Sequence, residues 1–315
     1  MTTRFGYACI NMPLSEQKPK VFCGRSMIKK TFDSKGISYA SQLAVQNTID
    51  LIKIISWNRA QGVEVFRITS CLFPWASEYE LSSLPDFRSI RSNLELAGKM
   101  ALEHNQRLSF HPGQFNVLTS PRPHVVKNCV KDLTIHGEIF DIMNMPRTPE
   151  SKINIHIGGA YGDRHSATDR WCKNFELLPE SVQSRLTVEN DDKPNMYSTK
   201  MLYDMVHKRT GVPIVFDSHH FECGPQDSTY DDAFLAAVST WPTGIRPQCH
   251  HSNSRKIYED PTARIAAHSD WYYKPFDDCG FDVDVILECK MKDRGLFKYL
   301  NDFVHNKKKV EKLAA

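Results

Sequence analysis

The sequence predicts a single-domain α/β fold, a (β/α)8 TIM barrel with its active site at the C-terminal ends of the strands. Eight short runs of β-branched and aromatic residues recur along the chain. Most are separated by segments whose apolar residues stand three and four positions apart. The 315 residues suffice for eight such units around one core. A doubly wound open sheet is the main alternative, but no GxGxxG sequence follows the first run.

The expected elements follow in chain order. Strands are expected at residues 5–11, 63–70, 107–112, 152–159, 185–191, 212–220, 246–252 and 283–289. Helical spacing is clearest at residues 44–62, 87–106, 124–144 and 198–211. We therefore expect one barrel domain over residues 1–303, followed at 304–315 by a basic, flexible tail that contains NKKKVEK.

Composition limits the class of protein. Hydrophobic residues make up 41% of the chain, no apolar run is long enough to cross a membrane, and the N-terminus lacks the pattern of a signal peptide. We expect a soluble, monomeric, intracellular protein of the cytoplasm or nucleoid, or of the nucleus in a eukaryote. The net charge of +3 is too small to indicate nucleic-acid binding by itself.

Histidines and carboxylates end six consecutive expected strands. They are His111, His156, Glu189, Asp217, His250 and Glu288, with His220 three residues after Asp217 and His268 in the last long loop. The carboxyl ends of barrel strands meet at one rim, where these groups would repel or stay unpaired unless a cation neutralised them. The pattern therefore predicts a metal site.

Strand alternation separates candidate ligands from their neighbours, because residues two apart share a face. Gln248 and His250 share one face of the seventh strand and His251 takes the other, so we favour His250. Imidazoles and carboxylates without thiolates suit zinc, manganese, iron or cobalt, and the number of candidates indicates two or three ions. Such a site predicts metal-assisted hydrolysis or, less strongly, sugar isomerisation.

Eight motifs, spread over roughly residues 4–300, together closely resemble the ultraviolet damage endonuclease family. They are FRITSCLFPWAS, RLSFHPGQF, INIHIGGAYGD, ELLPESV, LTVENDD, VFDSHH, AAHSDW and VILECKMKD. The resemblance implies a barrel related to endonuclease IV that nicks damaged double-stranded DNA immediately 5′ of ultraviolet photoproducts, leaving a 3′-hydroxyl and a 5′-phosphate. It implies two or three divalent ions, foremost Mn²⁺, with Zn²⁺, Co²⁺ or Mg²⁺ as alternatives.

Matching the family's motifs position by position implies the same ligands as the strand ends. They would be His111, His156, Glu189, Asp217, His220, His250, His268 and Glu288, with His219 a neighbour. Two positions depart from the family. Glu78 stands where a histidine ligand is common, and its carboxylate could still bind a hard cation. Gln248 replaces a lysine that is modified to a carbamate bridging the metals. A lesion-binding protein without cleavage is therefore a second hypothesis, and a sugar isomerase a third.

The resemblance also implies positions that contact DNA. Gln114 and Phe115 would wedge into the duplex at the lesion, although Phe115 could instead pack in the core beneath the next helix. The remaining implied positions are Tyr7 and Asn11 at the damage pocket, Arg25, Lys29 and Lys30 on backbone phosphates, and Lys290 or Lys292 beside the reacting phosphate, with Gln248 at a catalytic position.

Overall fold

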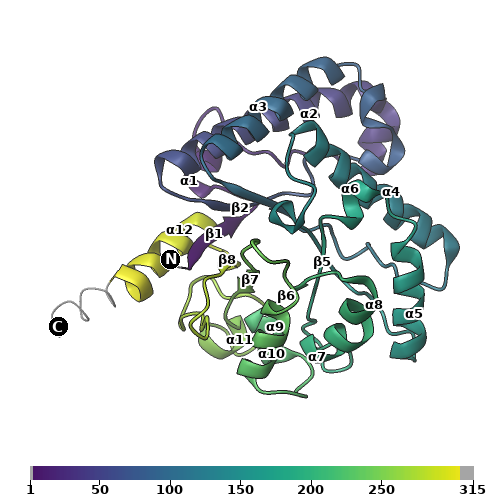
Figure 1. Ribbon diagram of the computed structural model, residues 1–315. Coiled ribbons are helices and arrows are strands. Elements are labelled where there is room, and N and C mark those ends of the chain that lie inside the picture. Colours follow the sequence, from purple (N-terminus) through teal and green to yellow (C-terminus); the bar gives the residue numbers. More distant parts are fainter. Residues whose placement is uncertain (1–2, 306–315) are drawn as a thin grey trace.

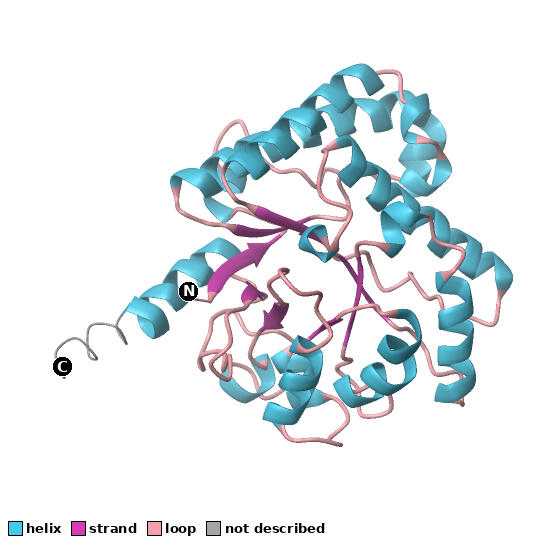
Figure 2. Ribbon diagram, in the orientation of Figure 1, coloured by secondary structure: helices cyan, strands magenta, loops and turns pink. Residues whose placement is uncertain are grey.

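Eight parallel strands in one sheet form the centre of the protein, and helices surround them (Figures 1 and 2). The structure is a computed structural model that describes residues 3–305. The strands are β1 (Arg4–Ala8), β2 (Val65–Ile68), β3 (Arg107–Phe110), β4 (Ile153–His156), β5 (Leu186–Glu189), β6 (Ile214–Val215), β7 (Gln248–His251) and β8 (Asp284–Leu287). This architecture confirms the predicted (β/α)8 barrel.

The sheet closes into a barrel between its two outer strands. The strand order is β6-β5-β4-β3-β2-β1-β8-β7, so β6 and β7 stand at the ends of the continuous ladder. A single parallel bridge joins Asp217 to His250, and the backbone N–H of His250 donates to the carbonyl oxygen of Phe216 at 2.9 Å. The seam is therefore narrow, and it lies beside two predicted ligands.

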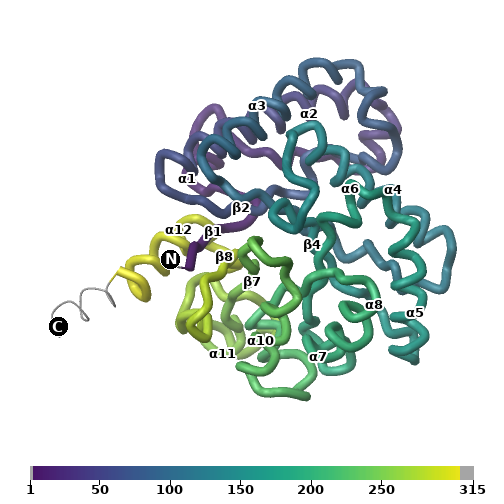
Figure 3. Tube along the Cα trace, viewed as in Figure 1, coloured from purple at the N-terminus to yellow at the C-terminus, as the bar shows by residue number. Residues whose placement is uncertain are grey.

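Helices cover the outside of the barrel (Figure 3). The longer ones are α2 (Lys29–Ala60), α3 (Phe87–Glu103), α4 (Pro123–Ile142), α5 (Arg164–Phe175), α10 (Tyr230–Val238) and α12 (Lys292–Tyr299). The shorter ones are α1 (Met12–Glu16), η1 (Ala76–Glu78), η2 (Leu81–Ser83), η3 (Pro149–Ser151), α6 (Glu180–Gln183), α7 (Thr199–Leu202), η4 (Tyr203–His207), α8 (Lys208–Thr210), α9 (Ser218–Cys223), α11 (Arg255–Tyr258) and η5 (Leu300–His305).

Two helical segments differ from the sequence-based expectation. Helix α2 begins at Lys29 rather than at residue 44. Gly36 interrupts its first part with a φ of +65°, and a glycine within a segment weakens the sequence signal for a helix. The helix expected at 198–211 is instead a succession of α7, η4 and α8. The predicted tail begins inside η5, and its residues from 306 on lie outside the described part of the chain.

The N-terminal end of the barrel is closed by buried ionic contacts. Arg107 is buried on β3, and its guanidinium donates to Asp284 on β8 at 2.9 Å and to the carbonyl oxygens of Pro149, Glu150 and Arg246. Although burial opposes ionisation of Asp284, its bonds with Arg4 and the charge of Arg107 lower its pKa. These contacts connect β1, β3 and β8 on the side away from the predicted site.

Within residues 3–305, no helix combines the length and the apolar composition that crossing a bilayer requires.

Candidate metal centre

Seven of the predicted ligands meet at the carboxyl ends of the strands. They form three groups, and within each group the nitrogen or oxygen atoms that could bind a metal lie within 4.8 Å of one another. The groups are His111, His156 and Glu189; Glu189, Asp217 and His220; and Asp217, His250 and Glu288. Neighbouring groups share Glu189 or Asp217. Shared carboxylates of this kind are what a cluster of adjacent ions requires.

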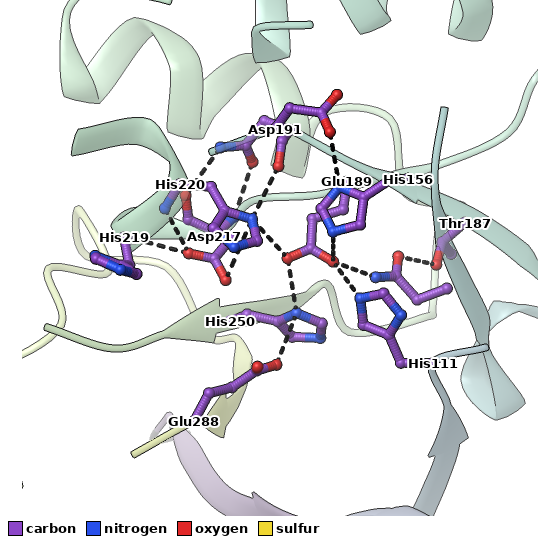
Figure 4. Close-up of polar contacts among 12 residues, drawn as sticks. His111, His156, Thr187, Glu189, Asp191, Asp217, His219, His220, His250 and Glu288 are labelled. Carbon is purple, nitrogen blue, oxygen red and sulfur yellow. Dashed lines mark hydrogen bonds and ion pairs between the residues drawn. The ribbon is translucent and has the colours of Figure 1, made fainter. Parts of the chain in front are cut away.

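Glu189 is the centre of the arrangement, and its two oxygens face four imidazole rings (Figure 4). Oε2 lies 3.0 Å from Nε2 of His111 and 3.9 Å from Nε2 of His156. Oε1 lies 3.0 Å from Nδ1 of His250 and 3.3 Å from Nδ1 of His220. The parallel register pairs Glu189 directly with His156, so adjacent strand ends bring these two groups together.

Asp217 and Glu288 complete the site on the side of the seam. Asp217 caps α9 by accepting the backbone N–H groups of His219 and His220 on Oδ1, which leaves Oδ2 buried and without a hydrogen-bond partner. Nδ1 of His250 lies 3.2 Å from the carboxylate of Glu288. One oxygen of Asp217 is thus fixed by the helix, while the other remains available to a cation.

Burial and neighbouring charges shift the pKa values of the site's side chains in opposite directions. Burial alone would raise the pKa of the Glu189 carboxyl, yet His250, His156 and the other imidazoles hold it well below its usual range. Burial lowers the pKa of His111 to about 4. Burial also opposes a charged His220, but Asp217 and Glu189 outweigh it and raise its pKa well above the ordinary value. The carboxylates thus favour protonation of the His220 ring. Bound divalent cations would supply that positive charge instead.

The donor set fits divalent metal ions. Bonds of about 2 Å place two donors on one ion roughly 3 to 4 Å apart, and the contacts around Glu189 lie in that range. Imidazole and carboxylate donors suit zinc, manganese, iron or cobalt. Oδ2 of Asp217 is a further sign, because it is buried without a hydrogen-bond partner and its contact with Nδ1 of His220 is long, at 3.8 Å. The residues present could therefore hold the group of ions predicted from the sequence.

A buried lysine stands beside the site and was missed in the sequence. Lys152 is fully buried just before β4, and its Nζ lies 2.8 Å from Nε2 of His250. Burial, opposed by the charge of Glu189, lowers its pKa to about 7. Gln248 is also fully buried, and neither atom of its amide has a hydrogen-bond partner among the described residues. Lys152, which directly precedes β4, therefore contacts His250, whereas the family's lysine would stand at position 248 on β7.

Replacing Lys152 with methionine should reduce metal affinity or cleavage about tenfold, because partners that orient a ligand histidine typically contribute that much. The free energy of unfolding should fall less than for the loss of a permanently charged partner, because the pKa of Lys152 is lowered to about 7 and methionine is an apolar chain of similar length. Metal titration and urea unfolding of the same variant measure the two effects separately. A loss of stability without any change in metal affinity would show that Lys152 has only a packing role.

His268, Glu78 and Lys290 lie around the cluster rather than within it. The His268 ring centre is 6.5 Å from that of His220, and its Nδ1 is buried without a hydrogen-bond partner, so it borders the site although it joins none of the three groups. Glu78 ends η1, is exposed, and likewise joins none of them. Lys290 is exposed two residues beyond Glu288. Their predicted roles stay predictions.

The predicted DNA-contacting residues differ sharply in exposure. Phe115 is 81% exposed and Gln114 is exposed on the loop after β3, so Phe115 is not a core residue. Tyr7 and Asn11 are buried instead. The hydroxyl of Tyr7 donates to Asn58 at 2.7 Å and accepts from the Asn11 amide at 3.0 Å. In this structure the loop after β3 carries an exposed aromatic ring, whereas the Tyr7 ring faces the core.

The basic segment before α2 is only partly free to contact phosphates. The guanidinium of Arg25 pairs with the buried carboxylate of Asp50 at 2.6 Å and donates to two backbone carbonyl oxygens. Lys29 pairs with Asp33 one turn further along α2. Lys30 is exposed. Arg25 thus fixes this segment to α2, which leaves Lys30 as its available charge.

Sequence reasoning also missed residues that hold the ligands. Asn154 and Thr187 form a chain to Glu189: the Thr187 hydroxyl donates to Asn154 at 2.8 Å, and the Asn154 amide donates to the Glu189 carboxylate. Arg67 on β2 pairs with Glu288. Strand alternation already places Asn154 on the face of His156, and extending that face by two more residues reaches Lys152.

The fold and the convergent donors define a (β/α)8 barrel protein with side chains at its C-terminal rim that could hold metal ions. A family model described as UV-endonuclease UvdE matches residues 3–315. The chain therefore belongs to the UV-endonuclease family, as the motifs indicated.

Related proteins agree with this assignment. The chain is 35% identical to the UV-damage endonuclease of Schizosaccharomyces pombe over 94% of its length, but it spans only 50% of that relative. It is 31% identical to a UV DNA damage endonuclease of Bacillus cereus, covering 96% of this chain and 95% of the relative.

Solved structures are similar in fold. The crystal structure of SacUVDE matches with a TM-score of 0.80 and 26% identity, covering 95% of this chain and 97% of the other. A D-psicose 3-epimerase of Clostridium cellulolyticum matches with a TM-score of 0.52 and 13% identity, over 91% of this chain and 85% of that one. The second likeness shows a shared fold alone.

Proposed function

We propose that this DNA repair endonuclease nicks duplex DNA immediately 5′ to ultraviolet photoproducts and leaves a 3′-hydroxyl and a 5′-phosphate. The observation that supports this most is the convergence of seven imidazole and carboxylate side chains at one rim of the barrel. Members of this family named as UV damage endonucleases share the whole length of the fold. We further propose a monomeric, intracellular protein that uses two or three ions, foremost Mn²⁺.

Ions held by the three groups would supply an activated water and positive charge beside the scissile phosphate. The chain's own residues do the positioning. Asn154 holds one oxygen of Glu189, and α9 holds one oxygen of Asp217, so both shared carboxylates have fixed orientations. The exposed Phe115 ring enters the base stack at the lesion, where stacking is already weakened and unstacking costs least.

The test is strand scission of an ultraviolet-irradiated duplex by protein loaded with Mn²⁺, with the cleavage ends mapped on a labelled strand. We expect a nick directly 5′ of the photoproduct and no nick in the unirradiated duplex. Tight lesion binding without scission, across mild acid to mild alkali, would instead support a lesion-binding protein. If the protein neither binds nor cuts the irradiated duplex, the proposal is refuted.

A further inference from the structure

We propose that a cationic groove between α4 and α5 binds the DNA backbone beside the lesion; this rests on the proposed function. The two helices lie next to each other on the outside of the barrel (Figure 3). The groove has a volume of about 470 Å³. It is lined by Ser120, Lys127, Arg170, Lys173 and Asn174, together with proline, valine and leucine side chains.

The groove is built for an anion with apolar faces. Lys127, Arg170 and Lys173 supply three positive charges, and the lining contains no carboxylate. Lys127 and Lys173 are exposed, and within residues 3–305 neither has an ion-pair or hydrogen-bond partner. Proline, valine and leucine side chains form much of the remaining surface. A sugar-phosphate backbone presents this combination, because its phosphates alternate with weakly polar deoxyribose rings.

The groove is continuous with the loop that carries the wedge residues. The Arg170 Nε–H donates to the carbonyl oxygen of Thr119 at 2.7 Å, and the Asn174 amide donates to Leu118 at 2.8 Å. Helix α5 therefore anchors the end of the loop after β3. Five residues separate Phe115 from Ser120, a reach of at most about 18 Å. A DNA backbone lying in the groove would thus pass within about half a turn of B-DNA, roughly 18 Å, of Phe115.

This location differs from the one that the sequence suggested. The basic segment before α2 was expected to contact phosphates, but Arg25 is held by Asp50 and Lys29 by Asp33. Lys127 and Lys173 are far apart in the sequence and form no charge run, and only the fold places both on the lining of one groove. Phosphate contacts position a protein without reading sequence, and unpaired cations suit that role.

The experiment compares two double variants that lose the same charge. Lys127→Gln with Lys173→Gln removes the groove's free cations, whereas Arg91→Gln with Lys99→Gln removes two exposed cations that pair with glutamates on α3. Affinity for a lesion duplex and for its undamaged counterpart is measured against salt concentration. We expect the groove variant to bind both duplexes about tenfold more weakly at 0.1 M salt, with a logarithmic salt slope shallower by about two.

Lys127→Arg with Lys173→Arg should restore the affinity and the slope, because each substitution keeps the charge. If the wild-type protein binds the lesion duplex and the groove variant matches both the wild type and the α3 control, the inference is wrong while the proposed function stands. The same result together with protection of the groove by inorganic phosphate would assign the groove to a small anion. If the wild type binds no DNA at all, the proposed function fails as well.

Discussion

Replacing Glu189 with glutamine should abolish most strand cleavage and lower the metal content of the protein. The carboxylate faces His111, His156, His220 and His250, so its charge serves two of the three ligand groups. Glutamine keeps the shape and the bond from Asn154 but offers only a neutral oxygen. We expect cleavage to fall by at least about 100-fold, since even the partners of metal ligands contribute up to that factor.

Glu103→Gln is the matched control for this variant. Glu103 is exposed at the end of α3 and lies outside the three groups, so its neutralisation should leave cleavage and metal content within twofold of the wild type. Metal analysis after dialysis and nicking of an irradiated plasmid would measure both quantities. Normal metal content and normal cleavage in Glu189→Gln would contradict the arrangement described for the site. Glu78→Gln tests the prediction for that residue, and a large loss of metal content would show that its carboxylate is a ligand.

Replacing Arg107 with methionine should destabilise the whole barrel. The guanidinium is 1% exposed, pairs with Asp284 at 2.9 Å and donates to three carbonyl oxygens. Methionine would fill most of the space but would leave those acceptors unpaired. Removing one partner of a buried ion pair typically costs about 3–5 kcal/mol of unfolding free energy. Urea unfolding should show a lower midpoint with an unchanged slope.

Arg147→Met provides the comparison. Arg147 also pairs with two carboxylates, those of Asp141 and Glu180, but half of its side chain is exposed to solvent. Solvent-exposed pairs contribute little, so this variant should unfold close to the wild-type midpoint. Equal midpoints for the two variants would mean that burial of the Arg107 network adds nothing to stability.

Local patterns predicted the barrel and its ligands well because each depends on few residues. The expected strands overlap the eight observed ones, and the six strand-end residues together with His220 are the seven that the structure brings together. The choice of His250 over His251 followed from alternation, and His251 indeed faces elsewhere, with Ser218 and the Lys274 carbonyl as partners. The residues that end a strand can be recognised locally, and closure of the barrel brings the ends of all the strands to one rim.

Properties that depend on distant partners were not predictable in this way. Arg25 is a surface charge by sequence but pairs with Asp50 in the middle of α2. Tyr7 was expected to face a lesion, yet the Asn58 side chain, 51 residues away, satisfies its hydroxyl within the core. Lys152 directly precedes β4 as an ordinary polar residue, and only closure of the barrel places it against His250. In each case a residue brought near by folding decides the role.

The seam between β6 and β7 links the cofactor to the integrity of the cylinder. Asp217 and His250 form its single bridge and both belong to the third ligand group. An ion coordinated by both side chains would act as a cross-link at the position where the backbone ladder is thinnest, and its binding energy would add to the folding energy there. Depletion of the cation would then loosen these two strands before the rest of the barrel, so loss of the ions and local unfolding would be one event.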